Sequence, residues 1–284
     1  MSASPRAERP SWLKVRAPAG GAADRVTESL RRLGLRTVCR DARCPNVGEC
    51  WGAGTATILV LGPSCTRGCG FCAVPHAPPA PPDPGEPSRV AAAAAELGWT
   101  TLVVTSVTRD DLPDGDAGHF ARIVDALRGL ARPPEIELLV PDFGGGREAL
   151  RKVVEARPDV LAHNVETVPR LYPRVRPRAV YARSLELLAR AREMAPDLAL
   201  KSGLMAGFGE SREEVAGVLR DLHAAGCRSV TLGQYLPPGP GHIPAAEYLA
   251  PEAFAEMGEA ARRIGFTRVV SGPLVRSSYR PKAS

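Results

Sequence analysis

The sequence predicts an α/β fold in which short parallel strands alternate with helices. Two observations support this prediction. Six apolar, β-branched stretches are each followed by a longer helical stretch, which is the pattern of parallel strands joined by crossover helices. The residues that can carry chemistry follow these strands, where functional loops lie in parallel α/β folds. Eight such units close a barrel; six, over residues 55–265, fit an incomplete (β/α)6 TIM-like barrel or a doubly wound sheet.

An N-terminal extension, residues 1–54, precedes the first strand and contains the first cysteines. Its beginning, up to about residue 36, is rich in Ala, Arg, Pro and Gly, and we expect a loosely packed segment with one helix at 22–33. The β-branched run TATILVL, residues 55–61, is the first expected strand.

The strand–helix units then follow one another up to residue 265. Prolines exclude residues 78–87 from a helix. We therefore expect the first helix at 89–97, with Ser88 as its N-cap. The remaining strands are expected at 101–105, 136–140, 160–162, 198–204 and 229–232. The remaining helices are expected at 119–130, 147–156, 182–194, 212–225 and 251–264. A C-terminal tail with an RSSY motif is expected at 266–284.

Composition indicates a soluble globular protein, because 44% of the 284 residues are hydrophobic and 24% are charged. No apolar run approaches the roughly 18 residues of a membrane span, and the N-terminus lacks the apolar core of a secretory signal. We therefore expect a cytoplasmic protein with no membrane partner. The net charge of +6 comes from scattered residues, so we expect no nucleic acid partner. The densest basic group is expected to be solvated or to meet an acidic protein or an anionic cofactor; its members are Arg170, Arg174, Arg176, Arg178 and Arg183.

Six of the seven cysteines form two triplets. Clustered thiols in a chain long enough to bury a core indicate metal binding rather than disulfides. In the second triplet, Gly68 and Gly70 let the backbone curl around a cuboidal iron–sulfur cluster, and three ligands leave one iron open for a small chelating molecule. A zinc site with His76 as fourth ligand is the alternative. The triplets are Cys39, Cys44 and Cys50 (C-x4-C-x5-C) and Cys65, Cys69 and Cys72 (C-x3-C-x2-C).

The second triplet lies in CTRGCGFC, which resembles the cluster loop of the radical S-adenosylmethionine (SAM) superfamily, including the aromatic Phe71 before the last cysteine. Other segments are similar to the lipoyl synthase family in particular. They are CRDARCPNVGECWGAGTATILVLG, TSVTRDDLPDG, HNVET, KSGLMAGFGE, GQYLPP and GPLVRSSY.

This resemblance implies a partial barrel of the radical SAM type and an enzyme, a sulfurtransferase, with two [4Fe–4S] clusters. Cys65, Cys69 and Cys72 would bind the cluster whose open iron chelates SAM and cleaves it to a 5′-deoxyadenosyl radical. Cys39, Cys44 and Cys50 would bind an auxiliary cluster, with Ser278, rather than Ser277, as its fourth ligand. An alkoxide is harder than a thiolate, so we expect that iron to be lost more easily.

The implied reaction inserts two sulfur atoms, at C6 and C8, into an octanoyl chain on a lysine of a carrier protein. The auxiliary cluster is the sulfur donor, and two SAM molecules are consumed per lipoyl group. The implied partners are acyltransferase subunits of 2-oxoacid dehydrogenases, the glycine-cleavage carrier protein, and flavodoxin or ferredoxin as electron donor. A biotin-synthase-like enzyme is one alternative, but it lacks the first triplet. A two-cluster electron carrier is another, but it needs far less chain.

The residues that follow the strands supply the candidate SAM contacts. The loop after the second strand is expected to meet the amino group of SAM. The loop after the fourth is expected to meet its ribose or the surroundings of its carboxylate. The segment after the sixth is expected to meet its adenine, with simple packing as the alternative for Tyr235. A lysine in the fifth strand is expected to pair with the carboxylate of SAM or with a nearby acid, and His163 is expected to be a core residue. In the same order, the candidates are Ser106, Arg109, Asp110 and Asp111, then Asn164 and Glu166, then Gln234, Tyr235 and Leu236, and finally Lys201.

Overall fold

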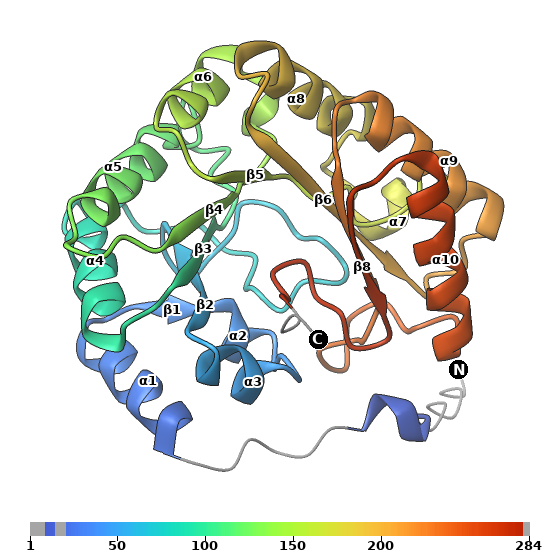
Figure 1. Ribbon diagram of the computed structural model, residues 1–284, viewed down its shortest axis with the longest axis horizontal. Coiled ribbons are helices and arrows are strands. Elements are labelled where there is room, and N and C mark those ends of the chain that lie inside the picture. Colours follow the sequence, from blue (N-terminus) through green and yellow to red (C-terminus); the bar gives the residue numbers. More distant parts are fainter. Residues whose placement is uncertain (1–8, 15–20, 281–284) are drawn as a thin grey trace.

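A computed structural model describes residues 9–14 and 21–280 of the chain. A single eight-stranded sheet runs in chain order from β1 to β8, and its curved strands are covered by helices on the outside (Figure 1). Strands β2 to β8 are parallel, whereas β1 pairs antiparallel with β2. Because β1 and β8 are the two edges of the described sheet, the barrel is open, and the predicted partial barrel is confirmed.

The six expected strand–helix units are all present. The strands are β1 (Arg36–Thr37), β2 (Thr55–Val60), β3 (Thr101–Ser106), β4 (Glu135–Leu139), β5 (Val160–Ala162), β6 (Ala199–Ala206), β7 (Ser229–Gln234) and β8 (Arg268–Gly272). The helices that cover them are α4 (Glu86–Leu97), α5 (Ala117–Arg128), α6 (Arg147–Glu155), α8 (Tyr181–Met194), α9 (Arg212–Ala224) and α10 (Pro251–Ile264), and a short α7 (Tyr172–Val175) precedes α8.

The sheet contains two strands that the sequence did not predict, β1 and β8. β8 lies where we expected the C-terminal tail to begin, and it pairs with β7 over five residues. As an edge strand it is only partly buried, so its short RVVSG segment lacks the strong apolar pattern of the inner strands. By contrast, all six residues of β2 are buried.

The expectation of a loose N-terminal segment is wrong for the described residues of helix α1 (Gly21–Arg32). Val26 and Leu30 of this helix, together with Leu35 after it, are buried in the main core. Two short helices that the sequence did not predict, α2 (Val38–Asp41) and α3 (Val47–Gly52), follow β1 and lead into β2. The first cysteine triplet is therefore part of the packed structure.

The N-cap prediction for the first crossover helix is also wrong. Helix α4 begins at Glu86 rather than Arg89, and Gly85, not Ser88, is its N-cap residue. Pro87 lies in the first turn, where a missing amide proton costs no hydrogen bond. No helix in the described part of the chain is long and apolar enough to cross a membrane.

Candidate metal-cluster site

The second cysteine triplet lies on the loop that follows β2, at the carboxyl edge of the parallel strands. The chain turns there through Leu61 and Gly62, which both have positive φ (66° and 100°). The Cys65 amide donates to the Pro75 carbonyl at 2.9 Å, which closes the loop on itself. The three partly buried thiols of Cys65, Cys69 and Cys72 are held within it.

Backbone amides point at the first thiol of this loop. The sulfur of Cys65 accepts hydrogen bonds from the Arg67 amide at 3.4 Å and from the Thr108 amide at 3.3 Å. Hydrogen bonds to sulfur favour the thiolate form that binds metal. Thr108 lies in the loop after β3, so this contact also joins two loops of the rim.

Arg67 fixes the loop to the neighbouring strands. Its buried guanidinium donates to both carboxylate oxygens of Asp110 and to Asp142, each at 2.7 Å. Burial acts to raise the pKa of Asp142, but hydrogen bonding and the charge of Arg67 outweigh it, so the pKa falls to about 2. Asp110, predicted to contact SAM, thus holds the cluster loop instead of standing free.

Burial raises the pKa of cysteine thiols in both triplets. It raises the pKa of Cys72 to about 11 and that of Cys50 to about 12. Burial also raises the pKa of Cys69, although the guanidinium of Arg176 acts in the opposite direction. Thiols with pKa values as high as those of Cys72 and Cys50 keep their protons at neutral pH, and they lose these protons when they bind a metal. This chemistry suits iron ligation.

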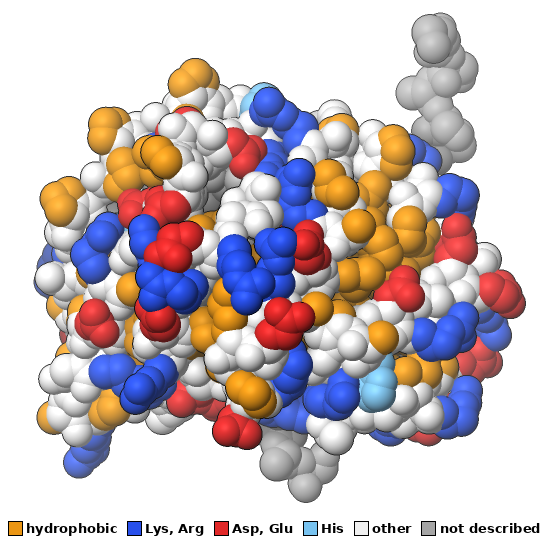
Figure 2. Space-filling view, turned by 90° about the horizontal axis from the view of Figure 1, so that it is seen from above, with side chains coloured by type: hydrophobic (Ala, Val, Ile, Leu, Met, Phe, Trp, Pro, Cys, Tyr) orange, Lys and Arg blue, Asp and Glu red, His pale blue; other side chains and the backbone are white. Residues whose placement is uncertain are grey.

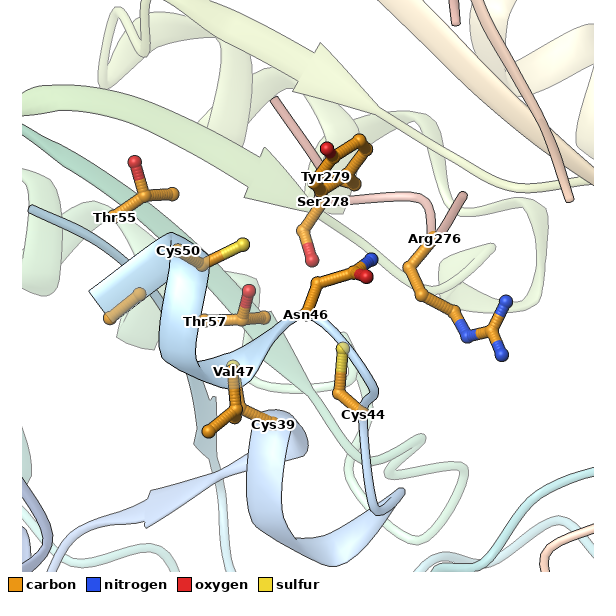
Figure 3. A pocket seen from close by; sticks show the side chains of 11 residues that line it. Cys39, Cys44, Asn46, Val47, Cys50, Thr55, Thr57, Arg276, Ser278 and Tyr279 are labelled. Carbon is orange, nitrogen blue, oxygen red and sulfur yellow. The ribbon is translucent and has the colours of Figure 1, made fainter. Parts of the chain in front are cut away.

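The first triplet surrounds a separate cavity. Figure 3 shows Cys39, Cys44 and Cys50 around one space, with the hydroxyl of Ser278 pointing into it and the guanidinium of Arg276 pointing away. Ser278, but not Ser277, lines the cavity. The cysteines come from the α2–α3 region, more than 200 residues before the serine. Three sulfurs and one oxygen thus line one cavity, and such donor atoms suit the irons of a cluster.

The C-terminal segment is tied over this cavity at several points. Asn46 donates to the Leu274 carbonyl at 2.8 Å, and the hydroxyl of Tyr279 donates to Glu49 at 3.0 Å. Asn46 and Glu49 stand between Cys44 and Cys50, so the tail is attached to the wall that carries two of the cysteines. These contacts fix the position of Ser278.

Several buried polar atoms have no partner in the described part of the chain, and three of them belong to predicted site residues or to Arg176, discussed below. They are the hydroxyl of Ser106, the side-chain carbonyl of Asn164 and the Nε of Arg176. Buried polar groups are nearly always hydrogen-bonded, so such atoms indicate a missing polar partner. They lie on segments that reach the carboxyl edge of the sheet, and a polar ligand such as SAM fits them.

The other predicted SAM residues have protein partners. Arg109 forms an ion pair with Asp111 at 2.8 Å, and Lys201 donates to both oxygens of Glu137, the nearby acid that the sequence left open. The amide group of Gln234 holds the backbone of Glu247 and Leu249, and Tyr235 stacks on Phe208 at 4.1 Å and donates to the Ile243 carbonyl. The side chain of Asn164 donates a hydrogen bond to Glu166, and the side chains of Phe71 and Leu236 are partly exposed.

The buried His163 has hydrogen-bond partners on both ring nitrogens, the Val140 carbonyl and the Ser184 hydroxyl. This confirms its predicted role as a core residue.

Arg176 is the site residue that sequence reasoning missed. Its side chain donates to the carbonyls of Asn164 and Val165 at 3.0 and 3.1 Å and lies over the ring of Tyr172. Its charge also acts on the Cys69 thiol. We expected its arginine group to be solvated or to meet an acidic protein or an anionic cofactor. The contacts of Arg176 with the backbone of the HNVET segment contradict the first alternative for this residue, and the second stays a prediction.

His76, the fourth ligand of the zinc alternative, has another partner. Its Nδ1 is 3.1 Å from the Cys65 carbonyl, and its ring is exposed. Across residues 9–14 and 21–280, no three His, Cys, Asp or Glu side chains converge as they do around a single ion. Thiolates that hold a cuboidal cluster are spread around several irons. The geometry favours a cluster over a closed zinc site.

Comparison with known proteins gives consistent matches. A family model described as the radical SAM superfamily matches residues 59–222, and one described as the N-terminal domain of lipoyl synthase matches residues 2–44. Lipoyl synthase of Caldanaerobacter subterraneus is 53% identical over 95% of this chain and 95% of its own length. Lipoyl synthase of Alkaliphilus metalliredigens is 49% identical over 95% and 93%.

Solved structures resemble the chain in fold. The match to HydG, a maturase of the [FeFe]-hydrogenase, has a TM-score of 0.58 at 12% identity and covers 88% of this chain and 66% of that one. The match to methylornithine synthase has a TM-score of 0.56 at 17% identity and covers 88% and 78%. At these identities the likeness concerns the fold alone.

Proposed function

The chain belongs to the lipoyl synthase family of radical SAM enzymes, and we propose that its two cysteine triplets have separate tasks in sulfur insertion. The reaction inserts two sulfur atoms, at C6 and C8, into a protein-bound octanoyl-lysine, with an auxiliary [4Fe–4S] cluster as sulfur donor. The cofactors are two [4Fe–4S] clusters and SAM. The single observation that supports the division is that the triplets line two separate places, only one of which includes Ser278.

In this proposal, Cys65, Cys69 and Cys72 hold the cluster that binds SAM. When bound, that cluster and SAM supply the radical chemistry that removes hydrogen from the octanoyl chain. Arg67 keeps the cysteine loop in place through Asp110 and Asp142. The loop cannot shift without breaking these buried ion pairs.

The unpaired polar atoms of Ser106, Asn164 and Arg176 are assigned to SAM. Arg176 is the only cation of the three, and a guanidinium suits a carboxylate. Glu166 accepts a hydrogen bond from the side chain of Asn164 at 3.0 Å, and burial raises the pKa of its carboxyl. Phe71, Tyr235 and Leu236 are assigned to the less polar side of SAM.

Arg109, Asp111, Lys201 and Gln234 are assigned a positioning role. The polar group of each side chain binds another part of the protein. Arg109, for example, also donates to the Leu61 carbonyl at the turn after β2. They shape the loops that the ligand meets.

Cys39, Cys44 and Cys50 hold the auxiliary cluster, with Ser278 as fourth ligand. That cluster is a substrate, because its sulfide ends in the product. The harder serine oxygen makes its iron the one most easily released. The tail contacts of Asn46 bring the serine to the cavity.

Octanoylated carrier proteins are the substrates of this family. We propose acyltransferase subunits of 2-oxoacid dehydrogenases and the glycine-cleavage carrier protein as the carriers, flavodoxin or ferredoxin as electron donor, and a cytoplasmic location. We also propose that residues 1–54, 55–265 and 266–284 are distinct parts in function: the auxiliary-cluster extension, the SAM barrel and the closing tail.

Anaerobic reconstitution followed by turnover of an octanoyl-lysine peptide tests the assignment. The wild type should bind two clusters and form lipoyl-lysine. Cys44→Ala should keep SAM cleavage but lose sulfur insertion, and Cys69→Ala should lose both. Cys227→Ala, a buried thiol outside both triplets, is the matched control. If Cys44→Ala still made lipoyl-lysine, the auxiliary assignment would be wrong.

A further inference from the structure

We propose that the exposed face of the Cys65–Cys72 loop is the docking surface for an acidic one-electron carrier protein. This inference rests on the proposed role of that loop as the holder of the SAM cluster. One electron leaves the carrier and enters the cluster, so the carrier is oxidised and the cluster reduced, and no bond forms or breaks. The surface, called here the donor patch, consists of Gly68, His76, Arg174, Arg178 and Val180.

The cysteine loop reaches the surface at Gly68. This residue stands between two cysteines and is exposed, whereas its neighbour Arg67 is buried. The exposed ring of His76 lies beside it, 3.6 Å from where a Cβ on Gly68 would be. A redox partner can therefore come close to the cluster at this point without any rearrangement of the loop.

Two arginines flank this exposed point because their segment packs on the loop. The Gly70 amide donates to the Val175 carbonyl at 3.0 Å, and the guanidinium of Arg178 donates to the Thr66 carbonyl at 2.6 Å. Arg174 and Arg178 are both exposed. The rim carboxylates Asp110 and Asp142 do not cancel this charge, since Arg67 binds both of them and Arg183 also binds Asp142.

The composition of the patch fits a transient electron-transfer contact. Such interfaces are small, with an apolar part and a charged edge. Val180 supplies exposed apolar surface, at 45% exposure, and the arginines supply positive charge that attracts an acidic partner. Figure 2 shows a face of the molecule on which Lys and Arg are interspersed with Asp and Glu.

Two substitutions change the charge of the patch without touching the cysteines. Arg174→Glu reverses a charge. Val180→Asp adds a carboxylate at the N-cap position of α8, where Asp is a favoured residue, so folding should not suffer. Arg263→Glu is the control: it is also an exposed arginine, but it lies in the last turn of α10, which leads into the start of β8, whereas the patch follows the ends of β2 and β5.

The test measures formation of 5′-deoxyadenosine by reconstituted enzyme with two reductants. With reduced flavodoxin, Arg174→Glu and Val180→Asp should each lower kcat/KM for the donor by about tenfold, while Arg263→Glu should not. With dithionite, which needs no docking, the patch variants should equal the wild type. Raising the salt concentration should slow the donor-driven wild type more than the variants.

Other outcomes distinguish failure of the docking surface from failure of the function assigned to the cysteine loop. Unchanged donor-driven rates in both variants, or an equal loss in the control, would overturn the docking surface. An effect confined to KM for the octanoylated carrier would overturn it as well, since that carrier would then be the occupant. Absence of dithionite-driven SAM cleavage in the wild type would instead overturn the function assigned to the cysteine loop.

Discussion

A four-charge network inside the barrel should determine how firmly the tail is held. Lys201 of β6 donates to Glu137 of β4 at 2.7 Å, and Arg280 of the tail binds Glu137 at 3.0 Å and Glu135 at 2.5 Å. The side chains of Glu137 and Lys201 are only 1% and 8% exposed, whereas that of Glu135 is 39% exposed. Glu137 is thus the central member, with a cation on each side.

The burial of each member gives the expected size of the effects. Glu137→Gln leaves the buried Lys201 without its carboxylate, and breaking a buried pair from one side costs about 3–5 kcal/mol. Arg280→Ala keeps the Lys201–Glu137 pair and releases a half-exposed Glu135 to water, so we expect a cost of about 1–2 kcal/mol. At about 2 °C per kcal/mol for a protein of this size, these costs lower Tm by about 6–10 °C and about 2–4 °C.

Thermal unfolding of the reconstituted protein, followed by circular dichroism, measures both shifts. Arg280→Ala should also speed the loss of auxiliary-cluster iron to a chelator, because Ser278 lies two residues before Arg280. Arg263→Ala, an exposed arginine without a role in the tail, is the control. A Glu137→Gln protein with a Tm within about 2 °C of the wild type would refute the reasoning, because Lys201 would then not depend on Glu137.

Three further predictions concern single residues. Ser278→Ala should retain SAM cleavage and lose lipoyl formation, while Ser277→Ala should retain both. Analysis of the reaction products measures the two activities, and normal lipoyl formation by Ser278→Ala would contradict its role as a ligand. Arg176→Gln should weaken SAM binding about ten- to hundredfold, through loss of about 1.5–3 kcal/mol; a Kd within twofold of the wild type contradicts this. Burial lowers the pKa of His163 to about 4, below the ~6.5 of an unfolded histidine. As the pH falls, the unfolded chain therefore binds a proton at this residue before the folded chain does. Up to about 3 kcal/mol of stability is lost between about pH 6.5 and pH 4. His163→Gln should remove that part of the pH dependence in denaturant unfolding, and an unchanged slope contradicts the assignment.

Local sequence predicted the parts of the fold that local physics decides. β2 is rich in β-branched residues, and α9 begins with a complete capping box at Ser211 and Glu214, so both elements were expected where they occur. β8 was missed because an edge strand buries less and therefore shows a weaker apolar pattern. The start of α4 was missed because proline was taken as an interruption, although it is tolerated in a first turn.

The candidate site was predictable only where its functional residues are close together in the sequence. The cysteines are close together in sequence, so their spacing indicates a cluster. Arg67 and Arg176 gave no such signal, since the partners of Arg67 are 43 and 75 residues away. Ser278 was expected from the family resemblance alone, because nothing within RSSY indicates a cavity more than 200 residues earlier in the chain.

Strand β2 sets the separation of the two cluster sites. Cys50 lies five residues before Thr55, and Cys65 lies five residues after Val60, so the two triplets adjoin opposite ends of one strand. Six residues at about 3.3 Å each make the strand about 20 Å long. It is buried along its whole length and paired on both sides, so it cannot bend or slide without disrupting the sheet. In the proposed reaction each reacting carbon would lose its hydrogen to a radical formed from SAM and then take a sulfide from the auxiliary cluster, so SAM and the octanoyl chain together must fill the space between the two sites. The rigid strand, rather than the tail, therefore sets the length of that space, and the tail supplies only the last ligand.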